Sequence, residues 1–322
     1  MKTDYFETRE NPFLIDIEDK DDYDWNDYVN IQQQLEEKSA SLDAFLQKLY
    51  PDEPIRTSLE EMKRRTKKGV TQKIIDGSGS LPTKQLFSLG NGGKNCIVCC
   101  TPLLNNRCDA SQIILQSLKE VEFNGHFLLL NGGFPNPTGT EMKYVGVPYS
   151  FKIFMMLEAK KMGFEKVIWI DAACYAINNL QPLFDKLESS DAIFTPYPPN
   201  VFGSDTCNNI VFPKTIELLN SLVNRDIRND TTINSIVFGL NFASPIINEF
   251  IKEYYDMVKL GLPFLSCFPE EIVFTAILNQ PKYHDMFLNP NLNGTLYVHN
   301  YHISKEDAKR YGYYFLQRQY DS

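Results

Sequence analysis

The strongest constraint on the fold is an alternation of strand-like and helix-like segments between residues 95 and 260. Short apolar runs bounded by Gly or Asn predict buried strands at 95–104, 126–130, 166–170, 192–197 and 235–240. Apolar residues at helical spacing predict helices at 109–122, 150–161, 181–189, 214–224 and 246–260. Such alternation predicts an α/β fold with a mainly parallel sheet that is covered by helices on both faces.

The segments on either side of this body have a different character. Residues 1–53 contain 15 Asp and Glu against 5 Lys and Arg, a net charge of −10, whereas the other 26 acidic and 27 basic residues leave the rest at +1. Helices are predicted at 28–50 and 57–68, and a Gly-rich connector or peripheral wrap is predicted at 69–93. We therefore expect three parts: an acidic, mostly helical N-terminal extension at 1–90, the α/β domain at 91–303 and a helical tail at 304–322.

Composition excludes several classes of function. With a net charge of −9, the chain has no excess of basic residues that would bind the phosphates of a nucleic acid. The chain has no apolar run of the roughly 20 residues that span a bilayer, and its start lacks the pattern of a signal peptide. Seven cysteines, several inside apolar runs, favour reduced thiols. These features predict a soluble, cytoplasmic protein whose oligomeric state the sequence leaves open.

Ligands of open α/β sheets bind beyond the carboxyl ends of the strands, so the residues that follow each strand are the candidates for chemistry. The pair Thr101-Pro102 follows the first strand, and its hydroxyl and backbone amides suit a nucleotide base or ribose; a simple turn is the alternative. No glycine motif of the phosphate-cradling or dinucleotide type opens a helix, so the signatures of kinases and dehydrogenases are lacking.

The strongest signal is Val167-Ile-Trp-Ile-Asp171, in which an apolar strand carries one carboxylate to its end. Such an acid is costly to desolvate unless it meets a cation, a metal ion or a hydrogen-bond donor, which favours a functional role over a helix cap. Lys152 lies in the first turn of a predicted helix and opposes the helix dipole, which favours an anionic partner. The alternative for Lys152 is a solvated surface position.

Taken together, these features resemble the GT-A fold of nucleotide-sugar-dependent glycosyltransferases, over roughly residues 94–302. The order and spacing of a Pro-Tyr-x-Phe-Lys motif and a Trp-x-Asp motif followed by an aromatic carry the resemblance, and here they comprise Pro148, Tyr149, Phe151, Lys152, Trp169, Asp171 and Tyr175. The resemblance implies transfer of a sugar, hexose or pentose, from a nucleoside diphosphate sugar to a hydroxyl group of a glycan or glycoprotein acceptor. It leaves open the sugar, the nucleotide, the acceptor and the stereochemical outcome.

The resemblance also implies roles for single residues on the donor side. Asp171 occupies the place of the first acid of an Asp-x-Asp motif and would bind ribose or a cation, Mn²⁺ or Mg²⁺, while Ala173 replaces the second acid and makes metal dependence uncertain. A late histidine would complete a metal site, preferably His302 and otherwise His299, although a structural role is as plausible for each. The remaining contacts to the donor would come from Thr101, Pro102, Tyr149 and Lys152.

On the acceptor side, the resemblance implies that Glu270 or Glu271 acts as the general base if the reaction inverts the anomeric centre. Both glutamates follow Pro269 in the first turn of a predicted helix, where capping alone explains one of them. Two other functions remain open. One is a catalytically silent glycan-binding or scaffold protein on the same fold, and the other is a sugar-phosphate nucleotidyltransferase, which is disfavoured because no Gly-rich basic loop follows the first strand.

Overall fold

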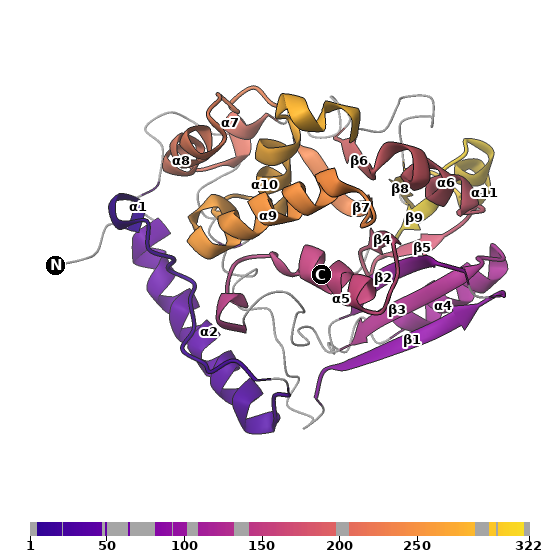
Figure 1. Ribbon diagram of the computed structural model, residues 1–322, viewed down its shortest axis with the longest axis horizontal. Coiled ribbons are helices and arrows are strands. Elements are labelled where there is room, and N and C mark those ends of the chain that lie inside the picture. Colours follow the sequence, from indigo (N-terminus) through magenta and orange to yellow (C-terminus); the bar gives the residue numbers. More distant parts are fainter. Residues whose placement is uncertain are drawn as a thin grey trace.

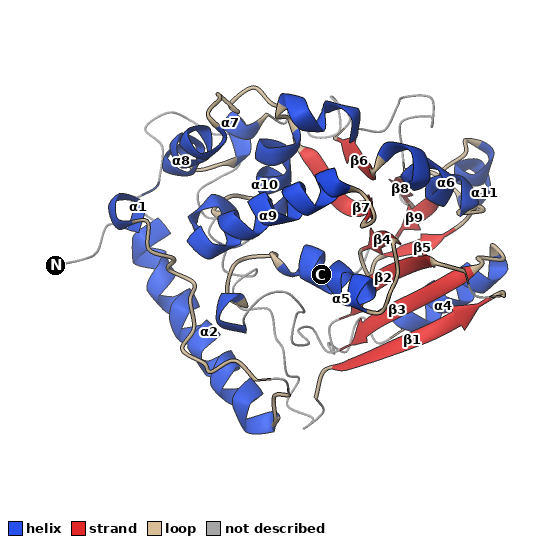
Figure 2. Ribbon diagram, viewed as in Figure 1, coloured by secondary structure: helices blue, strands red, loops and turns tan. Residues whose placement is uncertain are grey.

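The structure is a computed structural model that describes residues 5–20, 22–46, 49, 64, 81–91, 93–101, 109–131, 142–197, 206–286, 296–300 and 302–318. Its α-helices are α1 (Tyr5–Thr8), α2 (Trp25–Leu46), α4 (Ala110–Glu120), α5 (Phe151–Lys161), α6 (Gln181–Ser190), α7 (Cys207–Ile210), α8 (Pro213–Val223), α9 (Pro245–Leu260), α10 (Pro269–Leu278) and α11 (Lys305–Arg310). Its 3-10 helices are η2 (Met142–Tyr144), η3 (Leu262–Phe264) and η4 (Pro281–Met286). Its strands are β1 (Thr83–Leu89), β2 (Asn95–Thr101), β3 (Gly125–Asn131), β4 (Lys166–Ile170), β5 (Cys174–Ala176), β6 (Ala192–Pro196), β7 (Ile233–Asn241), β8 (Tyr297–His299) and β9 (Phe315–Gln317). Figure 2 distinguishes the helices and strands by colour.

The central sheet has the strand order β1-β3-β2-β4-β7-β6. Strand β2 pairs in parallel with both β3 and β4, while β7 is antiparallel to β4 and to β6. Four of these six strands, β2, β3, β4 and β6, therefore run in one direction. The predicted α/β class with a mainly parallel sheet is confirmed, but β7 runs opposite to its neighbours, a direction that the alternation of elements did not predict.

Two further differences concern the ends of the central domain. The prediction of a connector at 69–93 is wrong for Thr83–Leu89. This segment is strand β1, which pairs along its whole length with β3 as an antiparallel edge strand. Most residues of β1 are exposed, so they form no apolar run that marks a strand in the sequence. The tail predicted to be helical contains α11 but also β9, which lies between β5 and β8 in a second sheet and is only three residues long. The helix predicted at 57–68 lies, apart from Arg64, outside the described residues.

The two faces of the central sheet are covered by different helices, because side chains alternate between the faces of each strand. On β2, Cys96 and Val98 belong to one apolar cluster with residues of α5, α9 and α10, while Ile97 and Cys99 belong to another with residues of α4 and α6. Helices α5 and α10 thus cover the same face of the central sheet (Figure 1).

The N-terminal extension packs against the domain through the larger of these clusters. Phe13 and Leu35 are buried there together with residues just before α5, and α2 lies along one side of the molecule in Figure 1. Gly146 marks the contact, since a Cβ added to it would lie 2.5 Å from the backbone oxygen of Phe13 and 3.1 Å from Leu35 Cδ2. The amide of Asn11 donates hydrogen bonds to backbone carbonyls at the end of α9, those of Val258 and Lys259, both at 3.1 Å.

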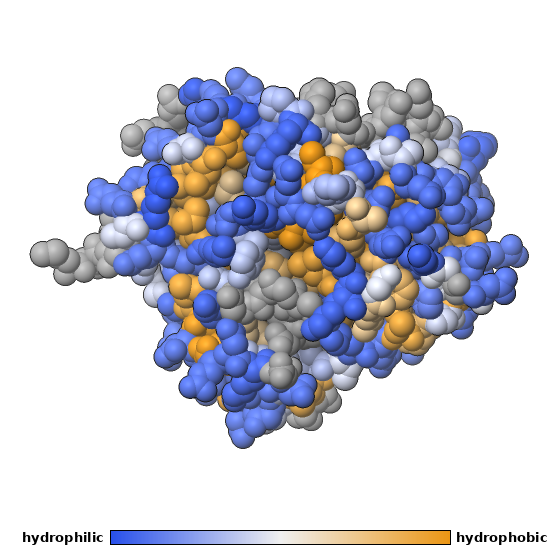
Figure 3. All heavy atoms as spheres, viewed as in Figure 1, coloured by the Kyte–Doolittle hydropathy of each residue, from blue (hydrophilic) through white to orange (hydrophobic). Residues whose placement is uncertain are grey.

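In the part of the chain that the structure describes, few large apolar side chains are exposed. The face shown in Figure 3 is mostly hydrophilic, with apolar residues in separate patches. Among the described residues, the exposed large apolar side chains are scattered over different elements, at Leu81, Leu86, Met162 and Tyr311. No helix in the described part of the chain is long and apolar enough to cross a membrane.

Candidate active site

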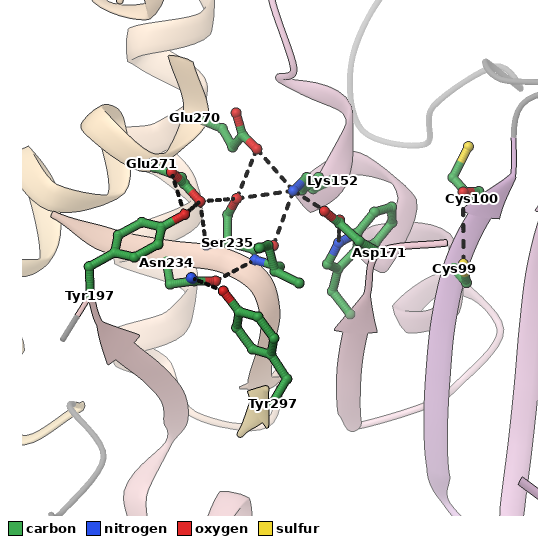
Figure 4. A network of polar contacts seen from close by, with 12 residues as sticks. Cys99, Cys100, Lys152, Asp171, Tyr197, Asn234, Ser235, Glu270, Glu271 and Tyr297 are labelled. Carbon is green, nitrogen blue, oxygen red and sulfur yellow. Dashed lines mark hydrogen bonds and ion pairs between the residues drawn. The ribbon is translucent and has the colours of Figure 1, made fainter. Parts of the chain in front are cut away.

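A buried ionic cluster joins three elements at the carboxyl end of β4 (Figure 4). Lys152 Nζ lies 3.0 Å from Asp171 Oδ1 and 2.9 Å from Glu270 Oε1. It also donates hydrogen bonds to the backbone oxygen of Ser235 at 3.1 Å and to Ser235 Oγ at 3.0 Å. Three of the residues predicted from the sequence, Lys152, Asp171 and Glu270, thus form one constellation.

Local structure explains how the cluster assembles. Asp171 directly follows β4, and Lys152 lies in the first turn of α5, which packs on β4 and β2. Pro269 begins α10, as predicted, and places Glu270 and Glu271 in its first turn. Because β7 is antiparallel to β4, its first residues lie beside the end of β4, where Asp171 N donates to Ile236 O at 2.9 Å.

Lys152 is buried, so the alternative of a solvated surface lysine is wrong. Its side chain is 5% exposed and its ammonium group, which has three protons, already faces four oxygen atoms. Burial by itself lowers the pKa of Lys152, but the charges of Asp171 and Glu270 outweigh that effect, and the pKa is raised. Lys152 is therefore a permanent cation that holds protein carboxylates and has no proton left for a diphosphate.

Glu271 is also buried and its carboxylate is fully engaged. Its Oε1 accepts hydrogen bonds from Ser235 N at 3.0 Å and Tyr197 Oη at 3.0 Å, and Ser235 Oγ lies 3.1 Å away. Burial raises the pKa of Glu271 to about 7, the neighbouring Glu270 adds to the rise, and Lys152 partly opposes it. Near neutral pH this carboxyl group therefore exchanges a proton while remaining inside the protein.

Glu270 is engaged through one oxygen only. Its Oε1 contacts Lys152 and accepts a hydrogen bond from Ser235 Oγ at 2.8 Å. No hydrogen bond or ion pair to Oε2 occurs within the part of the chain that the structure describes, and Figure 4 shows this oxygen pointing away from the cluster. Of the two glutamates predicted as general base, Glu270 therefore has the available oxygen.

Asp171 is the member of the cluster that reaches solvent. Its side chain is 31% exposed, compared with 7% for Glu270. Both contacts of its carboxylate are made by Oδ1, to Lys152 and to Trp169 Nε1 at 2.8 Å. Lys152 also lies over the Trp169 ring, 5.8 Å from its centroid, so the two donors fix the orientation of Asp171 from the protein side.

Four polar residues of this network were not predicted from the sequence: Tyr197, Asn234, Ser235 and Tyr297. Tyr197 lies just past the end of β6, whereas Asn234 and Ser235 lie at the start of β7. Asn234 Nδ2 donates to Tyr297 Oη at 2.6 Å, which connects β8 of the second sheet to the start of β7. A search at strand ends misses residues at the start of an antiparallel strand, although Asn234-Ser235 at the head of an apolar run is a detectable signal.

The other residues predicted for the donor lie outside this cluster of contacts. Thr101 is buried at the end of β2, and Pro102 lies outside the described residues. Tyr149 is half-buried with a φ of 54°, and its ring packs at 6.2 Å from that of Phe151. Tyr149 thus adopts a left-handed backbone conformation two residues before α5, which is strained for a non-glycine residue.

The predicted metal site does not fit the described residues. No three His, Cys, Asp or Glu side chains in the described ranges converge in a way that would hold a metal ion. The rings of His299 and His302 lie 6.0 Å apart, and the pKa of His299 is lowered by burial and by His302. Asp171 Oδ1 is bound to an ammonium group, and Ala173 supplies no ligand. We therefore derive no step through a metal ion.

Solved structures similar to this chain are glycosyltransferases, while no protein-family model and no curated protein matches it. One is a glycosyltransferase involved in glycosylation of the major capsid of PBCV-1, with 13% identity, a TM-score of 0.38 and coverage of 69% of this chain and 91% of that chain. Another is mouse xyloside xylosyltransferase 1, with 11% identity, a TM-score of 0.40 and coverage of 69% and 96%. A third is the bifunctional glycosyltransferase WbbM, with 10% identity, a TM-score of 0.44 and coverage of 71% of this chain but 46% of that one. At these identities and TM-scores they assign no activity to this chain.

Proposed function

We propose that this protein is a glycosyltransferase that moves a sugar from a nucleoside diphosphate sugar to a hydroxyl acceptor. The observation that carries the proposal is the buried cluster of Lys152, Asp171 and Glu270, which opens to solvent through Asp171 at the carboxyl end of β4. Burying the carboxyl groups of Glu270 and Glu271 near a single ammonium group is costly for folding, which supports a functional reason for the arrangement. The position at the strand ends is where open α/β sheets bind ligands.

The geometry supports a division of roles among the charged residues. Asp171 contacts substrate through Oδ2, and Lys152 is a positioning residue that orients Asp171 and Glu270. Glu270 acts as general base through Oε2 if the reaction inverts, while Glu271 stays inside the protein. The diphosphate is held outside the cluster, because the cluster has more carboxyl groups than cations and repels a phosphate.

We also infer a reducing compartment, and we favour the cytoplasm. Four of the described cysteines, Cys96, Cys99, Cys174 and Cys207, are buried thiols that form no disulfide. Turnover of hexose and pentose nucleotide sugars distinguishes transfer of a hexose from transfer of a pentose.

The first prediction tests the role of Asp171. Asp171→Asn keeps the shape of the side chain but removes its charge, so turnover of nucleotide sugars should fall at least about 100-fold, the scale for losing one preorganised electrostatic partner. The measurement is donor consumption with a panel of UDP-, GDP- and ADP-sugars, with and without Mn²⁺. Since Ala173 provides no second carboxylate, excess Mn²⁺ should not restore turnover.

A matched control is Asp256→Asn, which changes an exposed carboxylate paired with Lys259 and should leave turnover unchanged. Near-normal turnover in a folded Asp171→Asn protein would remove Asp171 from the site. Absence of any turnover in the unaltered protein, together with binding of a glycan, would favour the catalytically silent binder instead.

A further inference from the structure

The hydroxyl of Ser235 faces both glutamates at the start of α10 (Figure 4). Its oxygen lies 2.8 Å from Glu270 Oε1 and 3.1 Å from Glu271 Oε1, and Lys152 Nζ donates a hydrogen bond to it at 3.0 Å. All four side chains are buried. One hydroxyl group therefore meets one cation and two carboxyl groups away from solvent.

A count of protons shows what these three contacts require. A serine hydroxyl has one proton to donate and two lone pairs that accept. Lys152 donates to one lone pair, and the hydroxyl proton serves one of the two carboxylate oxygens. The other oxygen then faces the remaining lone pair, unless its own carboxyl group carries a proton and donates it. One proton on the pair of glutamates therefore satisfies all three contacts, whereas two ionised glutamates leave one contact repulsive.

The surrounding charges favour Glu271 as the place of this proton. Lys152 Nζ lies 2.9 Å from Glu270 Oε1 and stabilises negative charge on that residue. Burial raises the pKa of Glu271 to about 7, and the charge of Glu270 adds to the rise. Lys152 and the hydrogen bonds from Ser235 N and Tyr197 oppose the rise without cancelling it. The negative charge thus stays on Glu270, beside the ammonium group, while Glu271 holds the proton.

Other titratable groups around the pair do not supply this proton. Within the described part of the chain, the groups that face the pair are Lys152 on α5, Asp171 after β4, Tyr197 after β6, Tyr254 on α9 and Tyr297 on β8. Burial raises the pKa of each of these tyrosines, and the charges of the glutamates add to the rise. The phenols and the ammonium group therefore keep their protons, and the proton that exchanges near neutral pH belongs to the glutamates.

We propose that Ser235 is a positioning residue through which Glu270 and Glu271 share one proton. In the resting arrangement, Glu271 donates its proton to Ser235 Oγ while the serine hydroxyl donates to Glu270 Oε1. The proton reaches Glu270 when the O–H bond of Glu271 breaks as a new bond to Oγ forms. At the same time, the original O–H bond of Ser235 breaks and a bond from that proton to Glu270 Oε1 forms. The total charge of the pair is the same in both arrangements.

The use of this shared proton rests on the proposed function. With the proton on Glu271, Glu270 is a carboxylate and its Oε2 can accept a proton. In a transfer that inverts the anomeric centre, Oε2 takes the proton of the acceptor hydroxyl, and the electron pair of that O–H bond forms the bond to the anomeric carbon. The nucleoside diphosphate leaves with the electron pair of its bond to the sugar. Ser235 thus helps to keep Glu270 in the charged form that a general base needs.

Carbon-13 NMR of the full-length protein, labelled at the glutamate carboxyl carbons, tests the sharing without a substrate. Glu270→Gln and Glu271→Gln each remove one signal and thereby assign the two carboxyl groups. In a pH titration of the unaltered protein, both signals should move in a common step near pH 7, with the larger step at Glu271. Movement of the Glu271 signal alone would overturn the sharing, whether or not any variant of Ser235 folds.

Two serine variants show whether Ser235 carries the proton. In Ser235→Ala, the Glu270 signal should lose most of its step near pH 7, because the path between the carboxyl groups is interrupted. Ser117→Ala is a matched control on the other face of the sheet, since it removes a buried hydroxyl that bonds Ile114 O at 2.8 Å and Ala176 N at 3.0 Å. It should leave both steps in place. A common step that persists in a folded Ser235→Ala protein would overturn the part assigned to Ser235.

Turnover of nucleotide sugars tests the role of the shared proton in transfer. Ser235→Ala should lower kcat about tenfold, the scale of one hydrogen bond, and should leave KM unchanged because Ser235 is buried. If the unaltered protein turns over no nucleotide sugar, the proposed function fails, while the NMR titration still decides whether the proton is shared. If the unaltered protein is active and Ser235→Ala has the same kcat, the role of Ser235 in transfer is overturned and the proposed function stands.

Discussion

At the scale of single residues, Lys152 is the group on which the candidate site depends. Lys152→Met keeps most of the side-chain volume but leaves Asp171 and Glu270 without their shared cation. Removing one partner of a buried ion pair costs about 3–5 kcal/mol, so the free energy of unfolding in urea should fall by about that amount. The unfolding midpoint, at an unchanged slope, is the measurement.

Two comparisons define what this result means. Lys259→Met removes an exposed cation paired with Asp256 and should cost about 0–1 kcal/mol. Adding Glu270→Gln to Lys152→Met should recover part of the lost stability, since it removes a carboxylate that has lost its cation. A Lys152→Met protein as stable as the unaltered one would show that this lysine does not hold the cluster together.

The pKa of Glu271 predicts how stability depends on pH. The folded chain holds the proton of this carboxyl group up to about pH 7, whereas an ordinary glutamate releases it near 4.5. The folded state therefore binds more protons in this window, and the free energy of unfolding contributed by Glu271 falls as pH rises from about 4.5 to about 7. The total change should be on the order of 3 kcal/mol.

Glu271→Gln should flatten this dependence, because the amide does not titrate. Urea unfolding of both proteins at several pH values between 4 and 8 provides the comparison. The exposed Glu188, which pairs with Lys166, offers a matched control in Glu188→Gln, where the pH profile should keep its slope. A Glu271→Gln profile as steep as that of the unaltered protein would assign the slope to other groups.

These residues also show what the sequence could predict of the site. Asp171, Lys152 and Glu270 were each found from local features, namely a strand end, the first turn of a helix and a proline. Their pairing was not predicted, because it depends on how α5 and α10 approach the sheet. Lys152 was expected to meet an anionic partner, but whether that partner is a ligand or the protein's own carboxylates is a question of packing.

At the scale of elements, prediction succeeded where a segment is buried and therefore apolar. The strand at 166–170 was predicted at its observed limits, and α9 was predicted within one residue at its start. β1 was missed because most of its residues face solvent, and β9 because three residues form no pattern.

The direction of β7 was missed because apolar runs specify burial but not orientation. That direction has a functional consequence, since it brings Asn234 and Ser235 to the carboxyl end of β4. There Ser235 forms hydrogen bonds with Glu270 and Glu271, and Asn234 forms one with Tyr297. An antiparallel strand inside a mainly parallel sheet thus supplies polar groups that the strand ends alone would not.

At the scale of the whole molecule, the acidic extension is joined to the α/β domain by a shared core. Phe13, Ile31, Leu35 and Leu42 belong to the apolar cluster that also contains Val145 and the buried residues of α5. The turn before α5, where Gly146 meets Phe13 and Leu35, leads directly to Lys152. The extension therefore supports the segment that positions the candidate site.

This shared core predicts that damage to the extension destabilises the whole protein. Leu35 is 1% exposed, so Leu35→Ala should lower the free energy of unfolding by about 2–5 kcal/mol through lost contacts and a cavity. Thermal unfolding monitored by fluorescence and by far-UV circular dichroism should show one transition at a lower temperature, because the cluster links both parts. Leu86→Ala, at a position of β1 that is 45% exposed, should change stability by no more than about 0.5 kcal/mol. Two separate transitions in Leu35→Ala, with the later one unshifted, would show that the extension unfolds independently of the domain.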